Sequence, residues 1–267
     1  VISGRNAATN AAALAQLQAL GSGQVQALTS TQLNNLNTTQ LAGLTSGQVQ
    51  NLSSSQLNAL TSVKLQALET GDVKALSSTQ IQSLSSSQLN NLSTGQVKAL
   101  STEQMRALGT AQLNNLSSTT VQALESTQIN ALTSTQVGGL TAAGVFNKLS
   151  TDQVAVLSTD VLRAASTSAI QGMGTVQLNA LGSSQIQALT SSQVQALSST
   201  QLNNVETGQV KNLSSAQVQV LTSSQLNMMT STALQALDTV DVQAIGTAVM
   251  QSLNSNALNG LASTQIQ

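Results

Sequence analysis

Leucine recurs every eight residues along most of the chain, and this spacing is the strongest pattern in the sequence. Numbering the octad from this leucine as site 1, sites 2 to 4 are mostly Ser, Thr or Gly, and site 5 is usually Gln. Site 6 is Val, Leu or Ile, site 7 is Gln, Asn or Lys, and site 8 is small. The leucine series runs without a gap through Leu20, Leu28, Leu36, Leu44, Leu52, Leu60, Leu68, Leu76, Leu84, Leu92, Leu100, Leu108, Leu116, Leu124, Leu132 and Leu140.

The polar sites predict one short helix in each octad. A hydroxyl residue at site 2 is followed three residues later by Gln at site 5, as in Thr29 and Gln32. This is the capping-box sequence, in which the two side chains each accept a hydrogen bond from a backbone amide at the start of a helix. Leu33 at site 6 and Leu36 at the next site 1 then lie on one helical face. Each octad is therefore predicted to be an N-cap followed by fewer than two turns of helix.

The few charged residues agree with these helices, because a helix dipole favours acids at its start and bases at its end. All nine acids lie at site 2, 4 or 5. Five of the eight bases lie at site 7, and Lys64 at site 5 is the clearest exception. The acids are Glu69, Glu125, Glu206 and Asp238 at site 2, Glu103, Asp152 and Asp160 at site 4, and Asp72 and Asp241 at site 5; the five bases are Lys74, Lys98, Arg106, Arg163 and Lys211.

Two other architectures compete with short helices. In one continuous helix an eight-residue repeat would drift by about 80° per octad, so the apolar stripe would spiral and could not be buried. A β-solenoid suits the many Ser, Thr, Asn and Gln residues and the lack of Pro. The apolar spacings of three and five are odd, however, and would place the two anchors on opposite faces of a strand. The helical interpretation is preferred over both.

A second period, of three octads, predicts the cross-section. Every third octad has a β-branched residue at site 6, and one residue is inserted within this series. We therefore expect an all-α solenoid of very short helices, with three helices per 24-residue coil and a triangular cross-section. Site 1 and site 6 side chains should point to its axis. The β-branched series is Val25, Val49, Val73, Val97, Val121, Val145, Ile170, Val194, Val218, Val242 and Ile266.

The same pattern divides the chain into four segments. Residues 1–19 are Ala-rich and half in register, which indicates a helical N-terminal cap. Residues 20–140 form the first octad array, residues 141–149 a nine-residue irregular repeat, and residues 150–267 a second array that should continue the same rod. The irregular repeat holds the single aromatic residue, Phe146, and is interpreted either as a bulged side where two arrays were joined or as a partner site.

Composition narrows the possible functions. Without His or Cys the chain has no imidazole base, no thiolate and no usual zinc ligand, so we expect no enzyme, no cofactor and no metal site. A net charge of −1 with eight Lys and Arg residues does not give the basic patch of a nucleic-acid binder. No apolar run approaches the roughly 20 residues that span a bilayer, so membrane insertion is not expected. The acid pairs Glu69 with Asp72 and Asp238 with Asp241 occupy sites 2 and 5 and are interpreted as capping-box substitutes.

The stretch Thr119-Thr120-Val121-Gln122-Ala123-Leu124 and its many near copies resemble the Leu-Thr-Thr-x-Gln-Val-x-Ala arrays of large bacterial secreted and cell-surface proteins. The resemblance covers the chain from about Leu20 onward. It implies an extracellular or cell-surface location and a structural role. The leading hypothesis is a rigid spacer or a self-assembling subunit of an extracellular filament, surface layer or adhesin stalk. The alternative is a periodic polar surface that binds polysaccharide or ice.

Self-association should proceed by end-to-end stacking into a homopolymer. Ile266 opens a fresh coil near the C-terminus, and nothing there looks like a polar cap. The candidate cover is the N-terminal face around Leu14, Leu17 and Leu20 of the next molecule, a heterologous contact of the kind that builds open filaments. Phe146 is the remaining candidate assembly residue.

Overall fold

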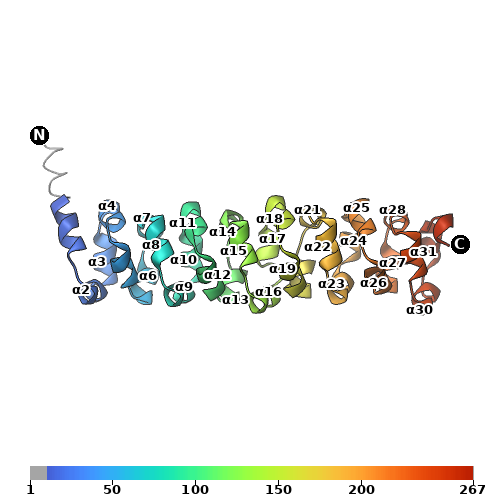
Figure 1. Cartoon of the computed structure of the whole chain (residues 1–267), viewed down its shortest axis with the longest axis horizontal. Coiled ribbons are helices and arrows are strands. Elements are labelled where there is room, and N and C mark those ends of the chain that lie inside the picture. The colour runs from blue at the N-terminus through green and yellow to red at the C-terminus, as the bar shows by residue number, and fades with distance from the viewer. Residues whose placement is uncertain (1–10, 267) are drawn as a thin grey trace, which may run out of the picture. The chain divides into compact units, whose positions relative to one another are not determined.

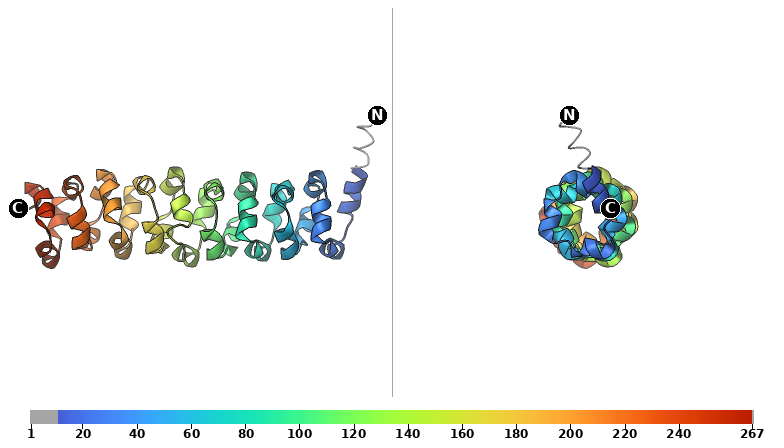
Figure 2. Two further views of the ribbon diagram at one scale, coloured as in Figure 1. Left: turned by 180° about the vertical axis from the view of Figure 1, so that it is seen from behind. Right: turned by 90° about the vertical axis from the view of Figure 1, so that its left-hand side faces the viewer.

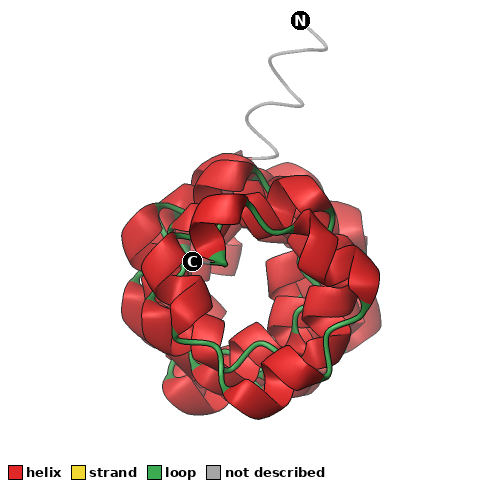
Figure 3. Cartoon of the chain, turned by 90° about the vertical axis from the view of Figure 1, so that its right-hand side faces the viewer, coloured by secondary structure: helices red, strands yellow, loops and turns green. Residues whose placement is uncertain are grey.

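A computed structural model describes residues 11–266, and within this range the chain consists of short α-helices joined by tight connections. Residues 11–18 are helical, and residues 1–10 of the predicted N-terminal cap lie outside the described residues. The α-helices α2 to α31 follow, and a single 3-10 turn, η1, comes last. No strand occurs among the described residues (Figures 1 and 3). The expected all-α fold is confirmed, and the β-solenoid alternative is wrong.

The chain divides into two compact units, residues 1–131 and residues 132–267. The helices of unit 1 are α2 (Ser22–Ala27), α3 (Ser30–Asn35), α4 (Thr38–Ala42), α5 (Ser46–Gln50), α6 (Ser54–Ala59), α7 (Ser62–Ala67), α8 (Thr70–Ala75), α9 (Ser78–Ser83), α10 (Ser86–Asn91), α11 (Thr94–Ala99), α12 (Thr102–Ala107), α13 (Thr110–Asn114), α14 (Ser118–Ala123) and α15 (Ser126–Asn130). Those of unit 2 are α16 (Ser134–Gly138), α17 (Val145–Lys148), α18 (Thr151–Ala155), α19 (Thr159–Ala164), α20 (Thr167–Gln171), α21 (Thr175–Asn179), α22 (Ser183–Ala188), α23 (Ser191–Ala196), α24 (Ser199–Asn204), α25 (Thr207–Lys211), α26 (Ser215–Gln219), α27 (Ser223–Met228), α28 (Ser231–Gln235), α29 (Thr239–Gln243), α30 (Thr247–Gln251), α31 (Ser255–Gly260) and η1 (Ser263–Gln265).

The helices begin and end where the octad pattern predicts, as α3 shows. At its start the amide of Gln32 donates to Thr29 Oγ1 at 3.2 Å, and the amide of Thr29 donates to Gln32 Oε1 at 2.8 Å. This is the expected capping box. At the other end Leu36, at site 1, has extended backbone angles, φ −60° and ψ 142°, which stop the helix. The short helices are therefore set by chemistry that lies within one octad.

Three helices make one coil. In unit 1 the most extensive helix–helix contacts include those of α5 with α8, α8 with α11 and α11 with α14; in unit 2 they include those of α20 with α23 and α28 with α31. A helix thus packs on the third helix after it, which is three octads further along a regular array. In the end-on views of Figures 2 and 3 the helices of a coil follow one another around an axis. The predicted three helices per coil are confirmed within each unit.

The interior of each unit is filled by site 1 and site 6 side chains. Val73, Val97 and Val121, successive members of the β-branched series, are all buried, as are the leucines Leu76 and Leu100 between them. Because every coil contributes the same few aliphatic groups, no single coil has a core of its own. Burial comes from stacking one coil on the next.

The irregular repeat is part of the interior of unit 2. α17 is only four residues long, and the Phe146 side chain within it is 0% exposed. The preceding backbone at Ala142 lies so close to Gly172 that a Cβ on Gly172 would be 2.0 Å from the Ala142 carbonyl oxygen. The inserted residue is thus accommodated by close backbone packing. Phe146, expected as a candidate assembly residue, presents no surface to a partner in this fold.

Candidate functional site

The polar residues of the octad gather between successive coils, where side-chain amides join backbone groups of different helices. Gln56 at site 5 shows the arrangement. Its Oε1 accepts from the Ser53 amide at 2.7 Å, and its Nε2 donates to the carbonyl oxygens of Val25 at 3.0 Å and Leu28 at 2.7 Å. Those carbonyls lie at the C-terminal end of α2, where a helix leaves its last acceptors without intrahelical donors. One side chain therefore serves the start of α6 and the end of α2.

This bridge recurs along both units, and we call it the inner amide ladder. In every case Oε1 accepts from the N-cap amide three residues before, and Nε2 donates to the carbonyls 31 and 28 residues before. All of these glutamines are buried. With Gln56 the members are Gln48, Gln80, Gln96, Gln104, Gln112, Gln128, Gln185, Gln193, Gln201, Gln217, Gln225 and Gln265.

The sequence predicted the capping contact of the site 5 glutamine but not its contact with another coil. The capping box was predicted from Ser or Thr at site 2 and Gln at site 5, but the donation to another coil and the burial of the glutamine were not. The available signal was the near-uniform choice of Gln at site 5, since Glu also completes a capping box. Of these two side chains, only the amide of Gln offers donors as well as an acceptor, because an ionised Glu only accepts.

A second set of amides, the outer amide ladder, links coils in the opposite direction along the chain. It consists of site 7 side chains that donate to a site 8 carbonyl of the next coil. Gln50 Nε2 reaches the Ala75 carbonyl at 2.8 Å, and Gln66 Nε2 reaches the Asn91 carbonyl at 2.9 Å. Asn34 Nδ2 reaches the Ala59 carbonyl at 2.8 Å, and its Oδ1 also accepts from the Thr61 amide at 3.0 Å. Site 7 therefore contributes to coil stacking although these bonds are exposed.

Two charged residues at site 5, Lys64 and Asp72, each make one part of the inner-ladder contacts. The Lys64 ammonium donates to the Leu36 carbonyl, which takes the place of the glutamine donor and explains why this base departs from the charge pattern. Buried Asp72 accepts from the Glu69 amide at 3.1 Å and from the Ser46 hydroxyl at 2.9 Å. Asp72 thus caps α8, in agreement with its interpretation as a capping-box substitute.

The remaining charges lie mostly at the surface. Lys98 Nζ and Glu125 Oε1 are 3.4 Å apart and form an ion pair. Both side chains are more than half exposed, so this pair contributes little to stability. In α17, burial lowers the pKa of Lys148. Among residues 11–266 no group of three or more Asp or Glu residues could hold a metal ion, and no helix is long and apolar enough to cross a membrane.

The candidate assembly residues divide by burial. Leu17 is buried in unit 1, and Leu14 and Leu20 are half-buried. Leu14 packs on Gly43, where an added Cβ would meet its Cδ1 at 2.2 Å. Ile266 in unit 2 is 58% exposed. Of these residues, Ile266 offers the largest apolar surface.

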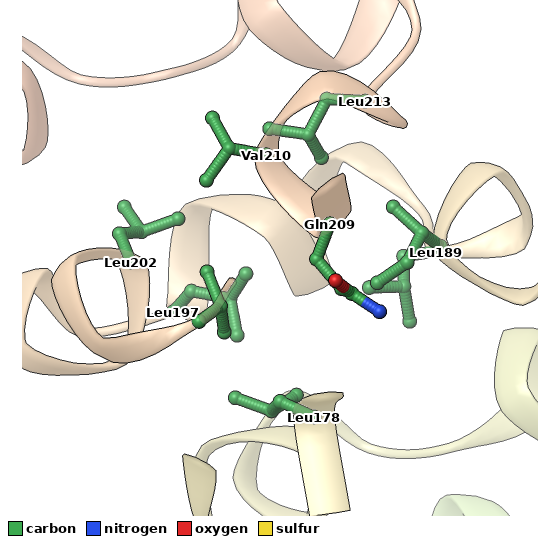
Figure 4. A pocket seen from close by; sticks show the side chains of 9 residues that line it. Leu178, Leu189, Leu197, Leu202, Gln209, Val210 and Leu213 are labelled. Carbon is green, nitrogen blue, oxygen red and sulfur yellow. The ribbon is translucent and has the colours of Figure 1, made fainter. Parts of the chain in front are cut away.

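Unit 2 also contains a small apolar cavity of about 20 Å³, shown in Figure 4. It lies where Val205 replaces the usual leucine at site 1. A space of this size holds about one water molecule and is a packing defect rather than a ligand site. The other lining residues are Leu178, Ile186, Leu189, Leu197, Leu202, Gln209, Val210 and Leu213.

Each unit is thus an α-solenoid of capped octad helices joined by two amide ladders. The model of one family, the ALTTAQ repeat, matches this chain over residues 65–102, 89–118, 105–142, 162–191 and 203–239. These matches together cover more than half of the sequence, and the chain belongs to the ALTTAQ repeat family. A comparison with curated proteins found no match.

Proposed function

We propose that this structural repeat protein acts outside the cell or at its surface, as a rigid spacer or as a subunit of a filament, surface layer or adhesin stalk. The observation that supports this proposal is the inner amide ladder. The most regular polar residue of the octad is buried and makes its bonds to the backbone of other helices. The distinctive chemistry of the repeat therefore serves the stacking of coils. The proposal assigns the chain no enzymatic activity, no cofactor and no nucleic-acid partner.

The partner we propose is a second copy of the chain, stacked end to end. Coils stack head to tail, so the two sides of a coil are different and complementary. A heterologous contact of this kind builds an open filament when its rotation does not close. The exposed Ile266 side chain supports a role for the last described turn in such a contact.

Particle length tests this proposal directly. Negative-stain microscopy and light scattering of the purified chain should show species longer than one molecule, and Ile266→Lys should shorten them. The matched control is Val63→Lys, because Val63 is 62% exposed but lies in α7, within the array. A monodisperse wild-type monomer would refute self-association, and equal particle lengths in wild type and Ile266→Lys would refute stacking through this residue.

A periodic polar surface is the second candidate function. The hydroxyl side chains of Thr31, Ser55 and Thr79 are exposed and recur once in each successive coil of unit 1. Such a column could match a repeating ligand, either polysaccharide or ice. A glycan array and a thermal-hysteresis assay of non-polymerised protein test this candidate. Strong activity in either assay would favour it over the structural role.

A further inference from the structure

Asparagines at site 7, such as Asn34 and Asn203, make two bonds to the next coil, whereas the glutamines Gln50 and Gln235 at that site each make one. Asn203 Nδ2 donates to the Met228 carbonyl at 2.6 Å, and its Oδ1 accepts from the Thr230 amide at 2.7 Å. Thr230 is the N-cap residue of α28. The N-cap amide of α28 therefore receives its acceptor from α24, 27 residues earlier.

Where site 7 is glutamine, the N-cap amide of the next coil can donate instead to the site 5 side chain of its own octad. Gln235 Nε2 donates to the Gly260 carbonyl at 3.1 Å, while the Ala262 amide donates to Gln265 Oε1 at 2.7 Å. The Gln50 side chain likewise donates to a single carbonyl, that of Ala75. The shorter asparagine side chain holds its oxygen beside the amide two residues beyond the carbonyl that its nitrogen meets. The choice of Asn or Gln at site 7 thus decides which coil caps the next helix.

The asparagine contact also accounts for four helices that lack glutamine at site 5. Lys64, Thr120, Ala233 and Ala257 each occupy site 5, and none of them accepts from its N-cap amide. In all four cases an asparagine at site 7 of the preceding coil accepts that amide instead. The pairs are Asn34 with Thr61 at 3.0 Å, Asn90 with Ser117 at 2.7 Å, Asn203 with Thr230 at 2.7 Å, and Asn227 with Asn254 at 2.7 Å.

The Asn58 side chain accepts from an N-cap amide even though a glutamine is present at site 5 of that octad. Its Oδ1 accepts from the Ser85 amide at 2.8 Å, although Gln88 stands at site 5 of that octad. Gln88 Oε1 accepts from Asn91 Nδ2 at 3.2 Å instead, and Gln88 Nε2 still donates to the Leu60 carbonyl at 2.8 Å. The asparagine contact is therefore an alternative way to cap the helix, used with or without a glutamine at site 5.

We propose that the site 7 asparagines are positioning residues that set the register of one coil on the next. Because they accept from the N-cap amide, the residue at site 5 does not have to provide that acceptor. The two amide atoms must meet a carbonyl and an N–H group two residues apart, so a shifted coil would lose both bonds. A buried asparagine fixes register in coiled coils by a comparable requirement. This inference deepens the proposed structural role, on which it rests, by naming the residues that align its coils.

The first test removes one asparagine and restores the cap from site 5. In Asn203→Ala the Thr230 amide should exchange with solvent faster, and the Tm should fall by about 2 to 4 °C. Adding Ala233→Gln should slow that exchange again, because Gln at site 5 accepts the N-cap amide in many other octads. The matched control is Gln235→Ala, which removes a site 7 amide and should leave exchange of the Ala262 amide unchanged.

Two results would overturn the proposal. One is unchanged exchange of the Thr230 amide in Asn203→Ala. The other is a folded Asn203→Ala/Ala233→Gln variant in which that amide still exchanges fast. Exchange reports bonds inside one molecule, and particle length reports association, so a failure here is distinguishable from a failure of the proposed function.

The second test adds a contact instead of removing one, so it does not depend on a damaged fold. Helix α30 begins after Gly246 without a side-chain cap, and Val249 stands at its site 5. Gln219 lies at site 7 of the preceding coil, in the same relation to Gly246 as Asn203 to Thr230. Gln219→Asn should therefore slow exchange of the Gly246 amide and raise the Tm.

The control for this second test is Gln195→Asn. The Thr222 amide that the new asparagine would meet already donates to Gln225 Oε1 at 2.9 Å, so its exchange should change little. Unchanged exchange at Gly246 in Gln219→Asn would count against the proposal.

Discussion

The site 5 glutamine stabilises the array because one carboxamide meets groups of opposite polarity on two helices. Its oxygen takes an N–H group that a helix start leaves open, and its nitrogen serves carbonyls that a helix end leaves open. In Gln104 the bonds of the nitrogen are buried and the bond of the oxygen is part-buried. A buried backbone group that is left without a partner costs about 1 to 3 kcal/mol. A residue at site 5 that has only one of the two functions therefore leaves the other backbone groups without this partner.

Gln104→Glu separates the two functions. The carboxylate can still accept from the Ser101 amide, now at 2.8 Å, but it cannot donate to the Val73 and Leu76 carbonyls, which lie 2.9 and 2.7 Å from Nε2. We expect a loss of about 1 to 3 kcal/mol or more in the free energy of unfolding, measured by denaturant titration at neutral pH. Gln82→Glu at an exposed site 7 is the control and should stay within about 0.5 kcal/mol. Equal losses in the two variants would contradict the bridging role.

The cavity beside Val205 gives a prediction of opposite sign. Val205→Leu restores the usual leucine of site 1 and adds one methylene group next to a void of about 20 Å³. Burying that group should raise the free energy of unfolding by about 0.8 kcal/mol. Calorimetry should show a higher Tm for Val205→Leu, whereas Val63→Leu at the surface should leave the Tm unchanged. A lower Tm for Val205→Leu would show that the site is already filled.

The helices themselves are far shorter than any that would persist alone. Most have five or six residues, and isolated helices below about 12 residues are marginal in water. Caps and packing against neighbouring coils therefore replace intrinsic propensity. Glycine serves as the N-cap of α13 and α22, so the array tolerates a cap residue without a hydroxyl.

Ser101 tests the weight of the hydroxyl cap on α12. The Gln104 amide donates to Ser101 Oγ at 3.2 Å. Ser101→Ala should lower the free energy of unfolding by about 1 kcal/mol, and Ser101→Gly by only a few tenths. Denaturant midpoints of the three proteins check this order. If neither variant lowered the free energy of unfolding, the cap hydroxyl would have no role in holding α12.

Across the molecule, each unit is built from neighbouring coils, so its stability should depend on coil register more than on length. Deleting the segment 65–88 of unit 1 removes one complete coil and keeps every later octad in its own column. Deleting the segment 65–72 removes only one octad but places the β-branched side chains over a different column.

We expect the single-octad deletion to lower the Tm more than the whole-coil deletion, although it removes less of the chain. Thermal unfolding followed by circular dichroism measures both. A milder effect of the shorter deletion would mean that the three columns are interchangeable.

The pH dependence of stability should also be a property of the whole chain. The sequence has no His and no Cys, the side chains that ordinarily titrate between about pH 6 and 9. Burial lowers the pKa of Lys148 below its ordinary value of 10.5, so the charged form of this side chain opposes folding. That cost is lost as pH rises through the native-state pKa towards 10.5.

We therefore expect a free energy of unfolding that changes little around neutral pH and rises slightly in alkaline solution, as Lys148 loses its proton in the native state. Denaturant titrations from neutral to alkaline pH check both parts. Lys148→Met should abolish the rise. A decrease in alkaline solution for the wild type, or an unchanged rise in Lys148→Met, would contradict this assignment.

The sequence alone was sufficient to predict the helices, their caps and the three-helix coil. These features depend on residues close together in the chain, such as Thr29 with Gln32, or on a strict period, such as the three-octad step that joins Val73, Val97 and Val121. Local hydrogen bonds and periodic burial leave a pattern that can be read without coordinates. The site 6 columns followed from the same period.

Only the tertiary structure decided which distant groups the side chains meet. The partners of Gln56 lie 28 and 31 residues away, and those of Asn203 lie 25 and 27 residues away, in directions set by the path of the coil. The same packing buried Phe146 inside unit 2. No pattern within one octad specifies these contacts, because they depend on how far one coil rises and turns before the next coil lies against it.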